Sequence, residues 1–119
     1  MIKHIVLWRL KDHAMGASKK ENAEKLKTLL ETLRHTLKEI KYLEVGINAD
    51  GSPHAAVAPG ILPPATLAHP CAADVALYSE FLSWDDLAAY QRHPEHLKVA
   101  SFVQEIRLER HVVDYEIAS

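Results

Sequence analysis

The first strand-like segment of the chain is largely apolar on both of its faces. It covers residues 2–10, which read Ile-Lys-His-Ile-Val-Leu-Trp-Arg-Leu. Because side chains alternate along a strand, one face carries His4, Val6, Trp8 and Leu10. The other face carries Ile5, Leu7 and Arg9. A strand with water on one side needs only one apolar face, so the fold must cover both sides of the sheet that contains this strand.

Three further segments have the alternation and composition typical of strands. They cover residues 42–47, 74–81 and 110–116. Residues 11–17, which follow the first strand, are expected to form an irregular connection. The chain is therefore predicted to contribute four strands.

Three helices are predicted between these strands. Ser18 with Glu21 fits a capping box, in which each side chain satisfies a free backbone N–H. An apolar stripe at spacings of three and four then continues for roughly 20 residues, through Leu26, Leu29, Leu30, Leu33, Leu37 and Ile40. Ser83 with Asp86 caps a second helix that ends before Pro94. Pro94 begins the third helix, since its missing N–H is no loss at the first helical position.

Residues 49–72 form a long segment without periodicity. The segment is rich in alanine and holds most of the prolines of the chain, namely Pro53, Pro59, Pro63, Pro64 and Pro70. Connections of this length inside a compact domain tend to be lids, binding loops or disordered insertions. Because this one is low in charge, we expect it to pack against the domain, either over the mouth of a pocket or as an extension of a dimer contact.

The pattern predicts a single α+β domain over residues 1–119, with one sheet and helices on one of its faces. The other sheet face then lacks a cover, although apolar residues of several strands lie on it: Ile5, Leu7, Ala76, Tyr78 and Val113. A second copy of the chain could supply the missing layer as a two-fold dimer. The alternative is a monomer in which residues 49–72 fold over this face. We favour the dimer, because the apolar pattern spans several strands.

Composition excludes several classes of partner. The chain is 48% hydrophobic and 25% charged with a net charge of -2, so no basic excess draws it to nucleic acid or to an anionic membrane. No apolar run approaches the roughly 20 residues that cross a bilayer. The single cysteine, Cys71, excludes an internal disulfide, and the N-terminal segment lacks a signal-peptide pattern. These features favour a cytoplasmic protein.

The residues best suited to chemistry gather at the junction of the two short helices. Residues 90–96 read Tyr-Gln-Arg-His-Pro-Glu-His, which places one phenol and two imidazoles close together. Imidazole is the side chain best suited to move a proton near neutral pH. Tyr90 and His96 lie on either side of the helix break, so their contact depends on the kink at Pro94. The alternative is that His96 packs at a helix N-terminus and Tyr90 fills the core.

Four segments in order and near the expected spacing resemble the stress-responsive A/B-barrel (Dabb) domain family. They are Met-Ile-Lys-His-Ile-Val-Leu at the start, the strand and helix from Phe81 to Tyr90, the His-Pro-Glu-His step at 93–96, and Val-Val-Asp-Tyr at 112–115. The resemblance covers nearly the whole chain except residues 49–72. It implies a ferredoxin-like protomer with a four-stranded antiparallel sheet. It also implies a homodimer in which two sheets face each other as a dimeric α+β barrel.

The resemblance extends to a plant polyketide cyclase of this kind, which closes a linear poly-β-keto thioester by aldol condensation without a cofactor. Its acid/base histidine matches His96 and its catalytic tyrosine matches Tyr90. Such chemistry needs removal of a proton next to a carbonyl and stabilisation of the resulting enolate oxygen. A neutral imidazole can do the first and a phenol O–H the second.

The same resemblance implies a pocket between sheet and helices that includes His4 and Asp114. A polar ring at His4 needs a hydrogen bond, which Asp114 on the final strand could supply. The apolar part of the substrate-binding lining is predicted at Val6, Trp8 and Leu77. Another pocket histidine of the cyclase falls at Val75 here, and the 49–72 insertion has no counterpart there, so the chain departs from the cyclase at both places.

Other reactive groups are not expected to carry chemistry. His93 precedes Pro94 and is predicted to be a cap or turn residue. His93 and His96 could be an H-x-x-H metal pair, but zinc needs three or four convergent ligands, so no metal site is predicted. Cys71 has no neighbouring base to activate it. The chain lacks a glycine-rich phosphate loop, a G-x-S-x-G elbow and a Cys-x-x-Cys pair, and no cofactor is expected.

Three functions remain open. The leading hypothesis is a homodimer that binds an apolar, carbonyl-bearing small molecule, with cofactor-free acid/base chemistry of the cyclase or lyase type. His96 would be the base and Tyr90 the oxyanion donor, with His4 and Asp114 in support. The second hypothesis is a non-enzymatic, stress-related stabilising or interaction domain whose dimer is its function. The third is a cofactor-free monooxygenase.

Overall fold

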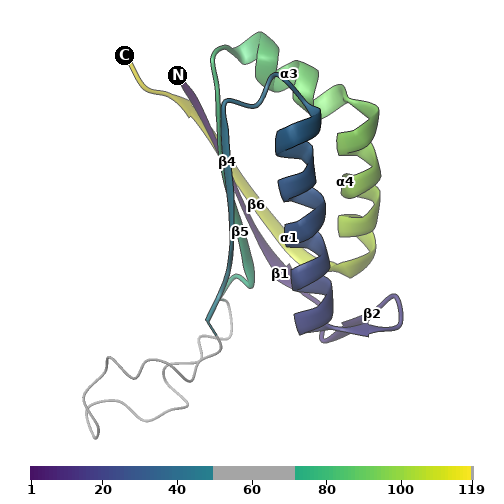
Figure 1. Cartoon of the computed structure of the whole chain (residues 1–119). Coiled ribbons are helices and arrows are strands. Elements are labelled where there is room, and N and C mark those ends of the chain that lie inside the picture. Colours follow the sequence, from purple (N-terminus) through teal and green to yellow (C-terminus); the bar gives the residue numbers. More distant parts are fainter. Residues whose placement is uncertain (50–71, 119) are drawn as a thin grey trace, which may run out of the picture.

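The computed structural model describes residues 1–49 and 72–118 of the chain. Its main sheet is antiparallel with the strand order β4-β5-β1-β6. The four strands are β1 (Ile2–Leu10), β4 (Tyr42–Ile47), β5 (Val75–Phe81) and β6 (Arg107–Glu116). The helices are α1 (Lys19–Thr36), α3 (Trp84–Arg92) and α4 (Pro94–Ile106). All three helices lie on one side of the sheet (Figure 1), which confirms the predicted α+β layer arrangement.

The central strand β1 pairs with β5 on one side and with β6 on the other. The predicted helix-facing side of β1 packs in the core, where Val6, Trp8 and Leu10 are buried together with His4. Residues directly opposite each other in an antiparallel pair point to the same face. The register sets Asp114 opposite His4 and Arg110 opposite Trp8, so these β6 side chains also belong to the helix side.

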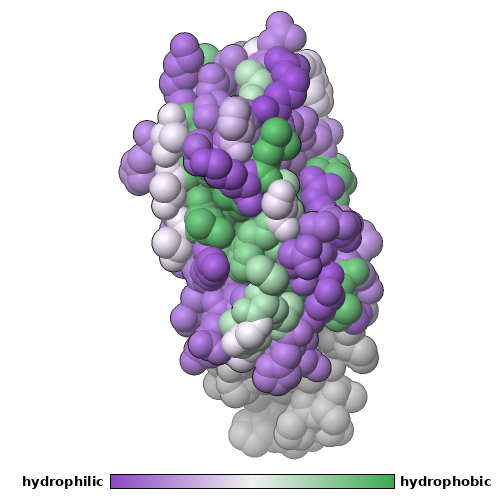
Figure 2. Space-filling model, turned by 90° about the vertical axis from the view of Figure 1, so that its right-hand side faces the viewer, coloured by the Kyte–Doolittle hydropathy of each residue, from purple (hydrophilic) through white to green (hydrophobic). Residues whose placement is uncertain are grey.

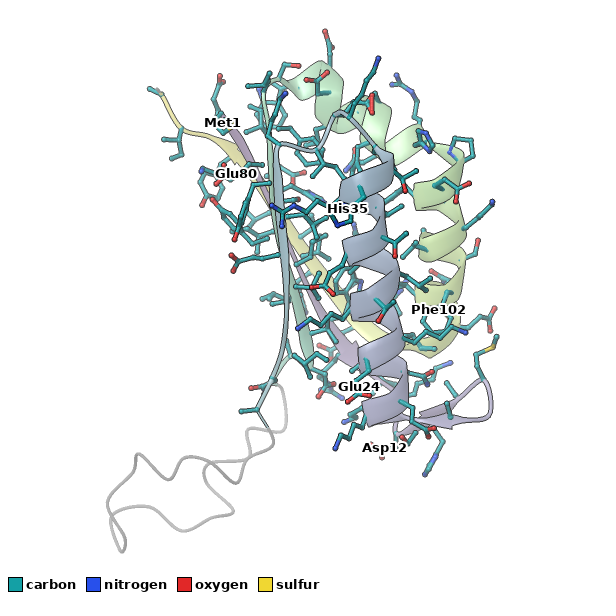
Figure 3. All side chains as sticks on the ribbon, in the orientation of Figure 1. Met1, Asp12, Glu24, His35, Glu80 and Phe102 are labelled. Atoms are coloured by element: carbon teal, nitrogen blue, oxygen red, sulfur yellow. The ribbon has the colours of Figure 1, made fainter. Side chains whose placement is uncertain are left out.

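The other face of the sheet is open. The register brings Ile5 level with Tyr78 and Val113, and Leu7 level with Ala76, so the five residues predicted for this face do share it. Leu7 and Val113 are exposed. Glu80 also projects from this face, away from the helices (Figure 3). No described helix covers this side.

The predicted helix-start signals are confirmed. The Ser18 side chain accepts a hydrogen bond from the Glu21 N–H, and the Glu21 carboxylate accepts one from the Ser18 N–H. The Ser83 hydroxyl caps α3 in the same way through the Asp86 N–H. Pro94 begins α4, so α3 and α4 are separate helices joined at a single residue, His93.

Three boundaries differ from the sequence prediction. Helix α1 ends at Thr36, because Leu37 adopts an extended backbone (φ -106°, ψ 115°), although Leu37 and Ile40 remain buried. The last two residues of the predicted apolar stripe are therefore buried although they lie beyond the end of the helix. The predicted strand over 110–116 begins earlier, at Arg107, directly after α4. The predicted strand over 74–81 begins one residue later, at Val75.

The predicted connection over residues 11–17 contains a small hairpin. Strands β2 (His13–Ala14) and β3 (Ala17–Ser18) pair across a two-residue turn. Met15 and Gly16 both have positive φ, 55° and 74°, as a tight hairpin turn requires. The sequence signal for it is only Gly16, because methionine rarely adopts this conformation.

The proposed packing of the 49–72 segment falls almost entirely outside the described residues. Over the part of the chain that is described, no helix is both long and apolar enough to span a membrane.

Replacing Leu26 with alanine tests the core between α1 and the sheet. Leu26 is fully buried, so we expect Leu26→Ala to lower the free energy of unfolding by about 2–5 kcal/mol. The matched control is Leu97→Ala on α4, where the side chain is 52% exposed and the loss should be within about 0.5 kcal/mol. Urea denaturation at one protein concentration gives both values. Equal losses in the two variants would contradict this core.

Candidate functional site

A cavity of about 280 Å³ lies between the sheet and the helices. Its lining comes from β1, β5, β6 and all three main helices: His4, Val6, Trp8, Leu30, Leu77, Tyr90, His96, Val99, Ala100, Val103, Gln104, Arg107 and Arg110. Figure 2 looks onto the helix side and shows hydrophobic residues gathered along its middle, within a largely hydrophilic surface. The volume lies just below the range of about 300–1,000 Å³ that is usual for small-molecule pockets.

His4 is held by Asp114 across the β1–β6 pair. The Nδ1 atom of His4 lies 2.5 Å from Oδ1 of Asp114, and the imidazole is almost fully buried. An ionised carboxylate can only accept, so Nδ1 carries the proton of this hydrogen bond. The predicted His4–Asp114 contact is therefore present. Asp114 does not line the cavity but fixes a ring that does.

Tyr90 lies at the centre of an aromatic cluster. Its ring centroid is 5.1 Å from that of Phe81, 6.1 Å from that of His4 and 4.5 Å from that of His96. Burial raises the pKa of the Tyr90 phenol, so it keeps its proton and remains a donor. Its hydroxyl is enclosed and has no hydrogen-bond partner among the described residues.

Trp8 supplies a second donor of the same kind. Its indole Nε1 is buried without a hydrogen-bond partner in residues 1–49 or 72–118. An unmet buried donor costs about 1–3 kcal/mol. Trp8 and Tyr90 both line one cavity, and two unmet donors in one place are typical of a site where a ligand or ordered water accepts these hydrogen bonds.

His96 lies just after the break between α3 and α4. It lies in the first turn of α4, and its Nδ1 donates to the carbonyl oxygen of Gln91 at 3.1 Å. A carbonyl oxygen can only accept, so in the neutral ring Nε2 holds the lone pair. Burial lowers the pKa of His96, the Gln91 hydrogen bond opposes the shift, and the neighbouring groups His4, Arg110 and His93 add smaller contributions that lower it further. The ring is thus held in the neutral form that can accept a proton.

Most of the residues predicted for the site come together. His4, Val6, Trp8, Leu77, Tyr90 and His96 all line the cavity. Their catalytic and binding roles stay predictions. His93 is a capping residue, as predicted, since its Nδ1 accepts from the Glu95 N–H at the start of α4. In the described residues no three His, Cys, Asp or Glu side chains converge in a way that could hold a metal ion.

The polar mouth of the cavity, formed by Gln104, Arg107 and Arg110, is not among the predicted site residues. One signal was present: Arg110 is four residues before Asp114, so strand alternation puts both side chains on the helix side. Arg107 was not placed in a strand at all, because the predicted strand began at residue 110.

Comparison with known families identifies the class of protein. Residues 2–59 and 67–117 match the model of the Stress responsive A/B Barrel Domain, abbreviated Dabb. The chain belongs to this family. No curated protein sequence matches it.

Solved structures confirm the ferredoxin-like fold. A dimeric protein of unknown function from Bacteroides fragilis is 31% identical, with a TM-score of 0.70 over 98% of this chain and 95% of that chain. A hydroxynitrile lyase from Passiflora edulis is 21% identical, with a TM-score of 0.69 over 98% and 93%. A putative antibiotic biosynthesis monooxygenase from Nitrosomonas europaea is 17% identical, with a TM-score of 0.68 over 100% of both chains. The last two show the fold alone.

The pKa of His96 can be measured directly. In an NMR titration we expect the His96 midpoint of the folded protein to lie below its ordinary value of about 6.5, and below that of the same residue in urea. The unfolded chain then binds more protons, so the His96 contribution to stability is complete above the unfolded pKa and is lost as the pH falls through the folded one.

The variant Arg110→Gln checks one of the smaller contributions to this shift, the nearby positive charge. Removing the nearby positive charge should move the His96 midpoint upward, while Arg92→Gln, which changes an arginine outside the cavity lining, should leave it unchanged. A folded midpoint at or above that of the unfolded chain would contradict the assigned environment.

Proposed function

We propose that the protein binds an apolar, carbonyl-bearing small molecule in this cavity and performs cofactor-free acid/base chemistry on it. The observation that carries the proposal is the combination of unmet donors with a neutral imidazole. Tyr90 and Trp8 offer buried donors, and His96 offers a lone pair, on the lining of one cavity.

His96 acts as the base in the proposed reaction. Its Nε2 takes a proton from the carbon next to the ligand carbonyl, and the low pKa keeps this atom free of a proton near neutral pH. The charge that develops on the carbonyl oxygen needs a donor. Tyr90 supplies it once that oxygen enters the enclosed inner end of the cavity, where the hydroxyl has no other partner.

His4 and Asp114 have a supporting role. The short hydrogen bond between them fixes the orientation of the imidazole that contacts the Tyr90 ring edge-on. The neighbouring apolar side chains Val6 and Leu77 exclude water and hold the hydrocarbon part of the ligand. A lyase or a cyclase reaction fits this set of groups, and a hydroxynitrile lyase shares the fold.

We also propose that two copies associate through the open sheet face. Ile5, Leu7, Tyr78 and Val113 form a continuous apolar area there, and exposed areas of this kind mark interaction sites. An ion pair within the chain, between Lys3 and Glu80 at 2.7 Å, lies on the same face and adds polar groups to it. The similar protein from Bacteroides fragilis is described as dimeric.

A second candidate function is a non-enzymatic stabilising or interaction domain whose dimer is its function. The exposed apolar sheet face favours it, as does the valine at position 75, where the cyclase has a histidine. A cofactor-free monooxygenase is a third candidate, supported only by the shared fold of the Nitrosomonas europaea protein.

Proton exchange next to a ketone tests the catalytic proposal. In D₂O we expect the protein to accelerate exchange of the α-protons of 2-octanone, followed by NMR, because His96 removes them. His96→Ala should slow the enzymatic rate by about 10²–10⁴-fold. Tyr90→Phe should slow it by about 10²–10³-fold, because it removes the oxyanion donor.

The matched control is His35→Ala. His35 is exposed in the last turn of α1, as Figure 3 shows, and does not line the cavity. Exchange at the buffer rate in the unaltered protein, or equal rates in His96→Ala and His35→Ala, would reject the catalytic proposal in favour of the second candidate.

A charge on the open face tests the dimer. Leu7→Asp should convert a dimer into a monomer in analytical ultracentrifugation, because an unpaired carboxylate would be buried between the sheets. Leu97→Asp places the same charge on an exposed apolar residue of α4 and should leave the dimer intact. A monomeric unaltered protein, or a Leu7→Asp variant that stays dimeric, would contradict the proposed interface.

A further inference from the structure

The mouth of the cavity carries positive charge without an acidic counterpart. Arg107 and Arg110 line it, and the described part of the chain contributes no aspartate or glutamate to the lining. Arg110 has neither an ion pair nor a hydrogen bond to any described side chain. Among the described side chains, the Arg107 guanidinium donates to one neutral partner, Oε1 of Gln104, at 3.2 Å.

The nearby acids are already engaged elsewhere. Asp114 accepts from His4. Glu109 precedes Arg110 and therefore points to the opposite face of β6, where it pairs with Arg9 at 3.2 Å and lies 3.4 Å from Nε2 of His111. The whole chain has a net charge of -2, so the positive charge at the cavity mouth is a local feature that the overall composition hides.

The polar groups of the cavity are arranged at two ends of an apolar space. At one end Tyr90, beside His4 and His96, provides a buried donor without a partner among the described residues. At the other end the half-buried Arg107 and the exposed Arg110, which lies opposite Trp8 in the β1–β6 register, provide charged donors. Between them the wall is hydrocarbon, with Leu77 and Val103 among its residues. A complementary ligand has acceptor oxygens at both ends, one of them charged, and an apolar part that joins or flanks them.

We propose that the natural ligand is a small oxo acid, whose carboxylate is bound by Arg110 with the help of Arg107 while its keto oxygen is directed to the Tyr90 hydroxyl at the other end of the cavity. The inference rests on the proposed function and names its substrate class. A guanidinium binds a carboxylate through two parallel hydrogen bonds, which fixes the orientation of the ligand as well as adding affinity. The same contact keeps the α-carbon of the ketone within the cavity, near His96.

A pair of probes that differ only in charge tests this inference. Isothermal titration calorimetry gives the Kd of 4-oxooctanoate and of 4-oxooctanamide for the full chain. We expect the acid to bind about tenfold more tightly than the amide, since charged hydrogen bonds are stronger than neutral ones. Arg110→Gln should remove this preference, so that acid and amide bind with similar Kd values, and Arg107→Gln should reduce it. Arg92→Gln, with the same loss of charge outside the cavity lining, should retain it.

The outcomes separate this inference from the proposed function. Equal binding of acid and amide overturns the carboxylate site but leaves ligand binding in the cavity standing. A preference for the acid that survives both Arg110→Gln and Arg107→Gln also overturns it, because the anion is then bound elsewhere. Binding of neither probe rejects both proposals for this ligand class. A shift of the Trp8 indole N–H resonance by either probe identifies the cavity as the place of binding.

Discussion

The central strand β1 is paired along both edges and apolar on both faces, and the rest of the molecule is arranged around this constraint. One face is covered by the helices. The other is open in the described chain, which calls for a second layer. The polar ring that β1 places on the covered face, His4, is matched by Asp114 on β6. The buried imidazole therefore lies where the β1–β6 register sets a carboxylate directly opposite it.

The cavity depends on how the chain turns after β5. The cap at Ser83 starts α3 and the proline at 94 ends it, so α4 begins at an angle that brings His96 back against Tyr90. The two rings come from different helices, and Phe81 and His4 come from the sheet beneath them. The same geometry removes water from both rings, which explains why burial shifts the pKa values of Tyr90 and His96 in the directions that suit a donor and a base.

Much of the fold could be predicted because local signals and the global fold agree. Alternation gave β1 its full length, and side-chain caps marked the starts of α1 and α3. The failures have physical reasons. Leu37 and Ile40 continue the apolar stripe because they are buried, but they lie outside α1. The hairpin turn needs a positive φ at Met15, which a methionine in the sequence does not predict.

The site was predicted less evenly than the fold. The predicted lining residues do share one cavity, because strand alternation and the break at Pro94 restrict where they can lie. The arginines at the mouth could not be identified from spacing alone. Their importance depends on the β1–β6 register, which sets Arg110 against Trp8, and on the engagement of Asp114 and Glu109 by other partners. Neither is visible in a single sequence.

The most direct test of this account is a crystal structure of the protein with 4-oxooctanoate. We expect the ligand between sheet and helices, with its keto oxygen within hydrogen-bond distance of the Tyr90 hydroxyl and its carboxylate on Arg110. His96 should face the carbon next to the ketone. A ligand bound outside this space, with the Tyr90 and Trp8 donors still unmet, would contradict the account.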